Sequence, residues 1–167
     1  MLRWKYGKKY EAVCANNRNA NPYKITIAAN LLVKKEVYKS FNLDTIGKLY
    51  AMDYYFGALL KKSKTKVLHL DNQVYHLGIE KSSNYLRKKE LATITLLKLH
   101  NEKKITKHSN DLLKLFVFCK KIGLNYLFSL WYKLFNSAMR KNLTGKNPII
   151  KLLQVYKLSY MCYINLA

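Results

Sequence analysis

A helical period in the second half of this 167-residue chain constrains its fold more than any other feature. Between residues 124 and 138, apolar residues recur every three or four positions: Leu124, Leu127, Phe128, Trp131, Leu134, Phe135 and Ala138. This spacing is typical of an amphipathic helix with one apolar face. The segments 85–104, 111–123 and 148–164 are also apolar enough to pack as helices. The sequence therefore predicts a helical region over residues 81–167.

Residues 1–80 predict a mixture of strands and helices. The segment 23–33 is rich in Ile, Thr and Val and indicates a buried strand, and 67–77 indicates one or two more. Between them, 34–41 predicts a short helix, and 49–63 places apolar residues at helical spacing. The order strand, helix, helix, strand is typical of an α/β sheet with flanking helices.

The composition combines a folded core with a strong positive charge. Half of the residues are hydrophobic, which excludes a disordered chain, and the formal net charge is +22. Such a charge favours a polyanionic partner: nucleic acid, an anionic membrane surface or a phosphorylated ligand. The 27 lysines against 4 arginines are explained equally well by the codon bias of an AT-rich genome. Because residues 1–90 and 91–167 each carry +11, no basic patch stands out, and nucleic-acid binding is disfavoured.

The cysteines and the apolar runs bear on the compartment. Cys14, Cys119 and Cys162 lie far apart without CxxC spacing, which argues against a disulfide framework or a zinc site and favours a reducing cytoplasm. The start of the chain lacks the apolar stretch of a signal peptide, and charged or amide residues interrupt every apolar run. We therefore expect a cytoplasmic chain that can lie on the inner face of the membrane without crossing it.

Five stretches carry a resemblance to a known family. They are, in order, "LRWKYGKK", "ITIAANLLVKKEVYKSFNLD", "YAMDYYFGALL", "VLHLDNQVYHLG" and "KNPIIKLLQVYKLSYMC". Together they resemble the C-terminal half of a bacterial family 2 glycosyltransferase with the GT-A fold. The resemblance implies a partial GT-A-like sheet in residues 1–80, the acceptor side of the catalytic domain, followed by a helical C-terminal extension over 81–167.

The resemblance also implies an activity and its partners. Such an enzyme moves a sugar from a nucleotide-sugar donor to a polysaccharide or a lipid-linked acceptor. The family's N-terminal half, with its Asp-x-Asp motif for Mn²⁺ or Mg²⁺, has no counterpart here. We therefore expect a fragment or a split chain, in which the missing half, on a separate chain, holds most of the donor and of the divalent cation.

Asp53 is the catalytic residue that the resemblance implies. It aligns with the general base that deprotonates the acceptor hydroxyl on the face opposite the leaving nucleotide. The sequence departs from the family's pattern at Met52, where a Glu that helps to bind the acceptor is usual. The plain alternative is an aspartate on a helix surface beside Lys48, Lys61 or Lys62.

Other candidates are weaker. His76 aligns with a metal ligand on a late strand, although a strand histidine is often only a hydrogen-bonding residue. Trp4 could stack on an acceptor sugar and Asn30 could border its cleft, but core packing explains an aromatic residue equally well. His69 is interpreted as structural, and His100 and His108 as surface residues.

The helices of residues 81–167 have two interpretations. Their apolar stripes can form a core, or, with the lysines around them, an interfacial membrane anchor. The second would suit a lipid-linked acceptor. The main alternative to the glycosyltransferase is a non-catalytic remnant that acts as a basic membrane- or protein-binding module.

Overall fold

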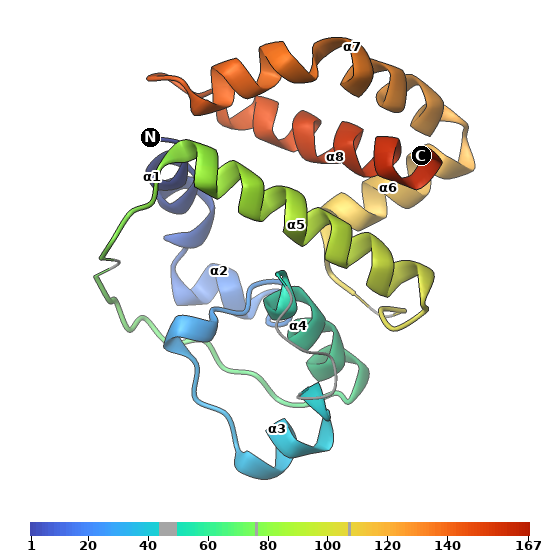
Figure 1. Cartoon of the computed structure of the whole chain (residues 1–167). Helices are drawn as coiled ribbons and strands as arrows, with labels where there is room; N and C mark the ends of the chain where they lie inside the picture. The colour runs from blue at the N-terminus through green and yellow to red at the C-terminus, as the bar shows by residue number, and fades with distance from the viewer. Residues whose placement is uncertain (44–49, 76, 107) are drawn as a thin grey trace.

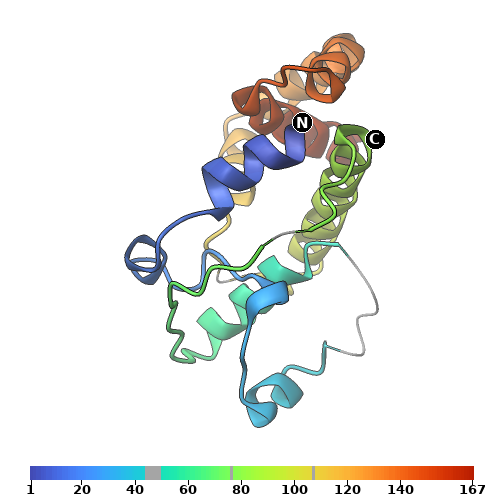
Figure 2. The same ribbon diagram turned by 90° about the vertical axis from the view of Figure 1, so that its left-hand side faces the viewer.

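The computed structural model describes residues 1–43, 50–75, 77–106 and 108–167, and helices carry the regular structure in these ranges. In chain order they are α1 (Leu2–Tyr6), the π-helical η1 (Gly7–Glu11), α2 (Ala15–Asn19), the 3-10 turn η2 (Ala28–Asn30), α3 (Lys35–Ser40), α4 (Met52–Lys62), α5 (Ser82–Asn101), α6 (Asp111–Lys121), α7 (Leu124–Thr144) and α8 (Ile150–Leu166). Figures 1 and 2 show α7 and α8 at one end of the molecule and α3 at the other, with α5 between them.

The last helix, α8, is the element on which the others pack. It contacts α7 along most of its length and also touches α5, α6 and α1. Leu153, Met161 and Cys162 are fully buried, and Tyr156 is almost so. A helix that is apolar on several sides cannot leave any of them in water without a cost, so it is covered from several directions.

Two apolar clusters meet along α8. The larger cluster joins α4, α5, α6 and α8 and contains Tyr55, Leu96, Leu113, Phe116 and Met161. The smaller joins α1, α5, α7 and α8 through residues Leu2, Tyr6, Leu86, Leu143 and Tyr156. Together they hold the short N-terminal helix α1 against the C-terminal bundle.

The four helices expected in residues 81–167 are present. Asn110 caps α6 by accepting a hydrogen bond from the backbone N–H of Leu113 at 3.0 Å. Gly123 has a φ of 80°, a left-handed conformation that glycine adopts without strain, and this lets the chain turn from α6 into α7. Ser82 does not cap α5; its hydroxyl accepts a hydrogen bond from the N–H of Leu2 at 3.1 Å.

The expected α/β fold is wrong. The described residues form no strand, so neither 23–33 nor the described residues 67–75 and 77 belong to a GT-A-like sheet. Residues 31–34, 65–75 and 77–81 lie without regular structure, and only η2 interrupts 25–34. Both segments have the composition of strands, but a strand needs a hydrogen-bonding neighbour. The described chain offers none.

Side chains satisfy part of the backbone that a sheet would have paired. Arg18 donates to the carbonyl of Leu70 at 2.7 Å, and the side chain of Asn19 bonds both the carbonyl and the N–H of His69. The apolar side chains of the same segment remain uncovered: Leu68 is 75% exposed and Tyr75 is 97% exposed. Hydrogen bonds from Arg18 and Asn19 therefore hold the backbone of this segment, whereas its apolar side chains remain exposed to solvent.

Gly57 lets one of these segments approach α4. A Cβ at this position would lie 2.7 Å from the carbonyl oxygen of Tyr23 and 3.0 Å from the Thr26 hydroxyl. Only a glycine leaves room for such backbone, which explains the "FG" pair in this helix.

The packing of α6 predicts a large difference between two leucines of that helix. Leu113 is fully buried, whereas Leu115 is 47% exposed. We expect Leu113→Ala to lower the free energy of unfolding by about 2–5 kcal/mol, because it removes apolar contacts and leaves a cavity. Leu115→Ala is the matched control and should cost well under half as much. Equal losses in urea denaturation would contradict the packing described here.

Candidate functional site around Asp53

Asp53 lies in the first turn of α4, two positions after a strained residue. Ala51, the residue before the helix, has a φ of 66°, a left-handed conformation that costs a non-glycine residue roughly 1 kcal/mol or more. A carboxylate in a first turn is favoured by the helix dipole, which is the ordinary reason to find an aspartate there. The helix dipole does not explain the left-handed conformation of Ala51. This conformation sets the direction in which α4 begins.

The surroundings of Asp53 raise its pKa above the usual value. Loss of water around the carboxyl is the main cause, and the negative charge of Glu11 adds to it, while the positive charge of Lys89 acts in the opposite direction. Asp53 is nevertheless exposed as a residue, and a hydrogen bond from its own backbone N–H also acts to lower the pKa. It forms no salt bridge with any residue that the structure describes. The carboxylate is therefore close to charged groups but remains available.

A group that we call the tyrosine–lysine cluster adjoins Asp53. Its members, which come from α1, α4, α5 and α8, are Tyr6, Tyr54, Tyr85, Lys89 and Lys157. The ammonium of Lys89 lies 4.8 Å from the centre of the Tyr6 ring and 4.9 Å from that of Tyr85, and the ammonium of Lys157 lies 5.7 Å from the Tyr6 ring. These distances suit cation–π contacts, so two cations share one aromatic ring.

Both lysines of the cluster lose affinity for their protons. Desolvation lowers the pKa of Lys157 to about 8, and the nearby charge of Lys89 acts in the same direction. Desolvation also lowers the pKa of Lys89, although Glu11 and Asp53 partly offset it. Neither lysine forms a salt bridge within the described part of the chain. Two desolvated ammonium groups without a carboxylate in direct contact are suited to an anionic or strongly polar ligand.

An unsatisfied hydroxyl lies in the same cluster. Tyr85 is 4% exposed, and its hydroxyl is buried without a hydrogen-bond partner in the described chain. Burial also raises the pKa of Tyr85, so this hydroxyl remains protonated and can donate. An unsatisfied buried polar group costs about 1–3 kcal/mol, and native proteins keep such groups mainly where a water, an ion or a ligand completes them.

The arrangement is chemically coherent for proton transfer to Asp53. A carboxylate with a raised pKa is a better proton acceptor than an ordinary aspartate, and none of the described residues forms a salt bridge with it that would hold it ionised. Lys89, whose charge acts on Asp53, and the hydroxyl of Tyr85, whose ring centre lies 4.9 Å from the Lys89 ammonium, can bind a hydroxyl-rich or anionic molecule.

The other residues predicted as acceptor-binding lie apart from this cluster. Trp4 is 51% exposed on α1, and its only cation–π contact among the described residues is with Lys8 at 5.1 Å. Asn30, in η2, donates to the carbonyl of Asn72 at 2.9 Å and so joins the two irregular segments. Among the described residues, neither forms a hydrogen bond or ring contact with Asp53 or with the tyrosine–lysine cluster, although Trp4 is two positions from Tyr6 on α1.

The metal prediction rests on a residue outside the described chain. His76 falls between the described ranges, so nothing is said of its position. The described residues bring no three His, Cys, Asp or Glu side chains together. His69 bonds the carbonyl of Pro22 through its ring at 2.9 Å.

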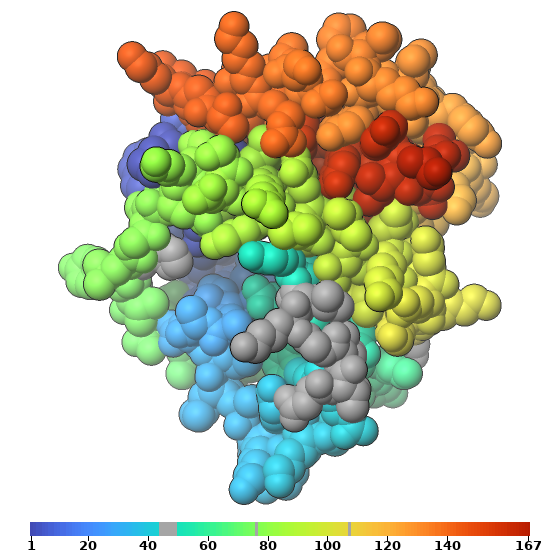
Figure 3. Space-filling model, viewed as in Figure 1, coloured from blue at the N-terminus to red at the C-terminus, as the bar shows by residue number. Residues whose placement is uncertain are grey.

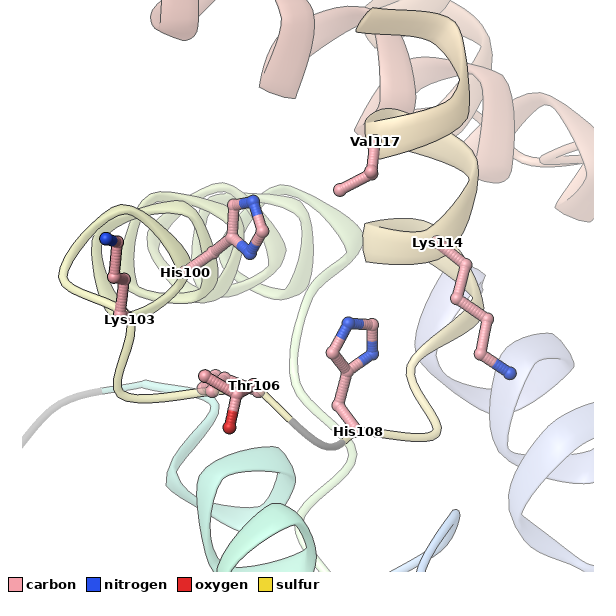
Figure 4. A pocket seen from close by; sticks show the side chains of 7 residues that line it. His100, Lys103, Thr106, His108, Lys114 and Val117 are labelled. Atoms are coloured by element: carbon pink, nitrogen blue, oxygen red, sulfur yellow. The ribbon is translucent and has the colours of Figure 1, made fainter. Parts of the chain in front are cut away.

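A separate open pocket of about 440 Å³ lies at the other end of α5. Figure 4 shows His100 from α5 and His108 from the loop before α6 directed toward the same hollow. Partial burial lowers the pKa of both histidines, and the charges of lysines around them act in the same direction. At 1.5 Å per residue, His100 lies roughly 20 Å along α5 from Tyr85, so this pocket is not part of the Asp53 site.

The sequence interpretation missed the two lysines of the tyrosine–lysine cluster. Lys89 and Lys157 lie 36 and 104 positions beyond Asp53, on helices whose packing no local pattern reveals. One signal was present: Tyr85 and Lys89 are four positions apart, and residues with this spacing on a helix lie side by side.

Comparison of the chain with protein-family models, with curated proteins and with solved structures finds no match. In the described ranges, no helix is both long and apolar enough to span a membrane.

The pKa of Lys157 predicts how stability depends on pH. An unfolded lysine keeps its proton up to about pH 10.5, whereas folded Lys157 releases it at about 8. Between these values the unfolded Lys157 binds more protons than the folded one, so Lys157 makes the free energy of unfolding rise with pH, by at most about 3 kcal/mol. The thiol of Cys162, whose pKa burial raises to about 12, opposes this rise above about pH 9, and the tyrosines with raised pKa oppose it above about pH 10, since these groups ionise first in the unfolded state.

We expect Lys157→Met to be more stable than the parent chain at pH 7, by a margin that shrinks between pH 8 and 10, because the opposing thiol and tyrosines are common to both chains. Lys151→Met, an exposed position on the same helix, is the matched control and should differ from the parent by the same amount at every pH. Urea denaturation at a series of pH values measures both differences. A margin between Lys157→Met and the parent that does not change with pH would contradict the desolvation of Lys157.

Proposed function

We propose that this chain is the acceptor-side part of a glycosyltransferase, with Asp53 as its general base. The observation that carries the proposal is the setting of Asp53: a carboxylate with a raised pKa, without a salt bridge to any described residue, and within reach of the charge of Lys89. The Lys89 ammonium lies 4.9 Å from the ring centre of Tyr85, whose hydroxyl has no partner in the described chain. The resemblance of the "YAMDYYFGALL" stretch supports the same residue independently. The proposal does not depend on a sheet within these residues.

The chemistry assigned to Asp53 is a single proton transfer. As the acceptor hydroxyl oxygen forms a bond to the anomeric carbon of the donor sugar, its proton passes to the Asp53 carboxylate. The bond from that carbon to the diphosphate oxygen breaks, and the electron pair leaves with the nucleoside diphosphate. The Tyr85 hydroxyl and the lysines would hold the acceptor, or its phosphate where it is lipid-linked.

The donor site belongs to residues outside these 167, on a preceding segment or a separate chain. The uncovered side chains of the irregular segments support this part of the proposal, because Leu32, Leu68 and Tyr75 are between 75% and 99% exposed. Such apolar side chains in adjoining segments suit a surface that another polypeptide covers.

The test compares two preparations of the full chain: alone, and co-expressed with the polypeptide encoded immediately upstream. The readout is release of UDP from UDP-glucose, UDP-galactose and UDP-N-acetylglucosamine in the presence of Mn²⁺. We expect activity only in the second preparation and a loss of about 100-fold or more with Asp53→Asn, since general-base catalysis contributes that much. Glu36→Gln, an exposed acid on α3, removes the same charge and should leave the rate unchanged.

Equal rates for the Asp53→Asn and Glu36→Gln proteins would refute the role of Asp53. No turnover in either preparation would count against the glycosyltransferase and favour a module that only binds. The pH profile gives a further check: because the base must be ionised, the acid limb should lie above the ordinary pKa of an aspartate.

A further inference from the structure

The apolar face of α7 points away from the bundle. Leu127, Trp131 and Leu134 are 59%, 43% and 66% exposed, whereas Asn125 and Ser129 on the opposite side are 3% and 6% exposed. A surface helix normally buries its apolar stripe and exposes its polar side. Here the arrangement is reversed, and the apolar stripe expected from the sequence lies almost entirely on the surface.

We define the outer face of α7 as Leu124, Leu127, Leu130, Trp131, Leu134 and Phe135, all more than a third exposed. The rings of Trp131 and Phe135 lie 4.5 Å apart, so the aromatic part of the face is continuous. Figure 3 shows α7, in orange, along the upper edge of the molecule in this view, with no other element above it. Leaving six large apolar side chains in water costs roughly 1.5–3 kcal/mol for each that a partner could bury fully, so an occupant is expected.

The charge around this face selects the kind of occupant. Residues 112–167 contain nine basic and no acidic residues. Lys133 and Lys141 are exposed on α7 itself, and Lys120 and Lys121 are exposed at the end of α6. Each basic residue near an anionic lipid surface contributes on the order of 1 kcal/mol to binding.

A second copy of the chain is a poor occupant for the same reason. Two outer faces pressed together would bring their lysines close to one another without an acidic residue to separate them. An anionic surface has no such cost. The mixture of leucine with tryptophan and phenylalanine, with lysines at the border, is also typical of helices that lie in the headgroup region of a bilayer.

We propose that the outer face of α7 binds the surface of an anionic membrane, with the helix lying parallel to the bilayer. Trp131 and the leucines enter the boundary between headgroups and acyl chains, and the lysines contact the lipid phosphates. This orientation fixes which side of the chain faces the lipid. The Asp53 site, on α4 at the side of α5 opposite to α7 (Figure 1), then faces away from the lipid. The proposal does not require the chain to be an enzyme.

The test is co-sedimentation of the full chain with vesicles of phosphatidylcholine alone or mixed with phosphatidylglycerol. We expect binding to the mixed vesicles, weakened by salt, and little binding to phosphatidylcholine. In a Trp4→Phe background, Trp131 is the single tryptophan, and its fluorescence should shift to the blue with the mixed vesicles. A chain that binds both kinds of vesicle equally, or whose Trp131 emission does not shift, would overturn the proposal.

Two pairs of variants distinguish binding through the outer face of α7 from non-specific binding through other exposed apolar side chains. Leu127→Ser with Leu134→Ser should weaken binding at least 10-fold, because two exposed anchors are lost. Leu68→Ser with Tyr75→Ser is the control, since it removes two apolar side chains elsewhere that are even more exposed, and it should bind as the parent does. If serine variants of α7 fail to fold, Lys133→Glu with Lys141→Glu gives the same information and should also weaken binding. Equal binding by all variants, or a dimer in sedimentation that Leu127→Ser with Leu134→Ser dissolves, would overturn the proposal.

Discussion

The burial of α8 is the constraint on which the rest of the molecule depends. Its apolar residues point in several directions, and five of them, with Ser159, are almost inaccessible to water: Leu153, Tyr156, Leu158, Met161 and Cys162. A helix of this kind can only be central, so α5, α6, α7 and α1 take positions around it. One polar network spans the same interface: Glu90 of α5 accepts hydrogen bonds from Arg140 of α7 and from Tyr156 of α8. Because only Tyr156 is fully buried among the three, this network adds orientation more than stability.

The candidate site is a consequence of that packing. α1 occupies the place between α5 and α8 and brings the Tyr6 ring to both Lys89 and Lys157. Lys157 is desolvated because it belongs to the central helix, and its pKa falls for that reason. The positions of these charges beside Asp53 thus follow from the fold, and not from any motif around Asp53 itself. The outer face of α7 has the same origin. Because the polar side of α7 packs against α8, none of the described residues covers its apolar side.

Helix positions could be predicted from the sequence, but the surroundings of each helix could not. The period between Leu124 and Ala138 placed α7 correctly, yet a period identifies an apolar face without saying what covers it. The strand predictions failed for a related reason: the composition of 23–33 and 67–77 favours extended backbone, but a sheet also needs a neighbouring strand, and none of the described residues supplies one. Asp53 was singled out by resemblance, whereas Lys89 and Lys157 needed the tertiary structure.

The central claim is that this chain is one side of a larger catalytic unit, and amide hydrogen exchange tests it most directly. The segments 24–34 and 65–75 have uncovered apolar side chains and little backbone pairing, so they should exchange fast in the chain alone. Joined to the upstream polypeptide, the same segments should become strongly protected, while the amides of α8 should change little. Unchanged exchange in both segments, in a preparation shown to contain the two polypeptides together, would contradict the account.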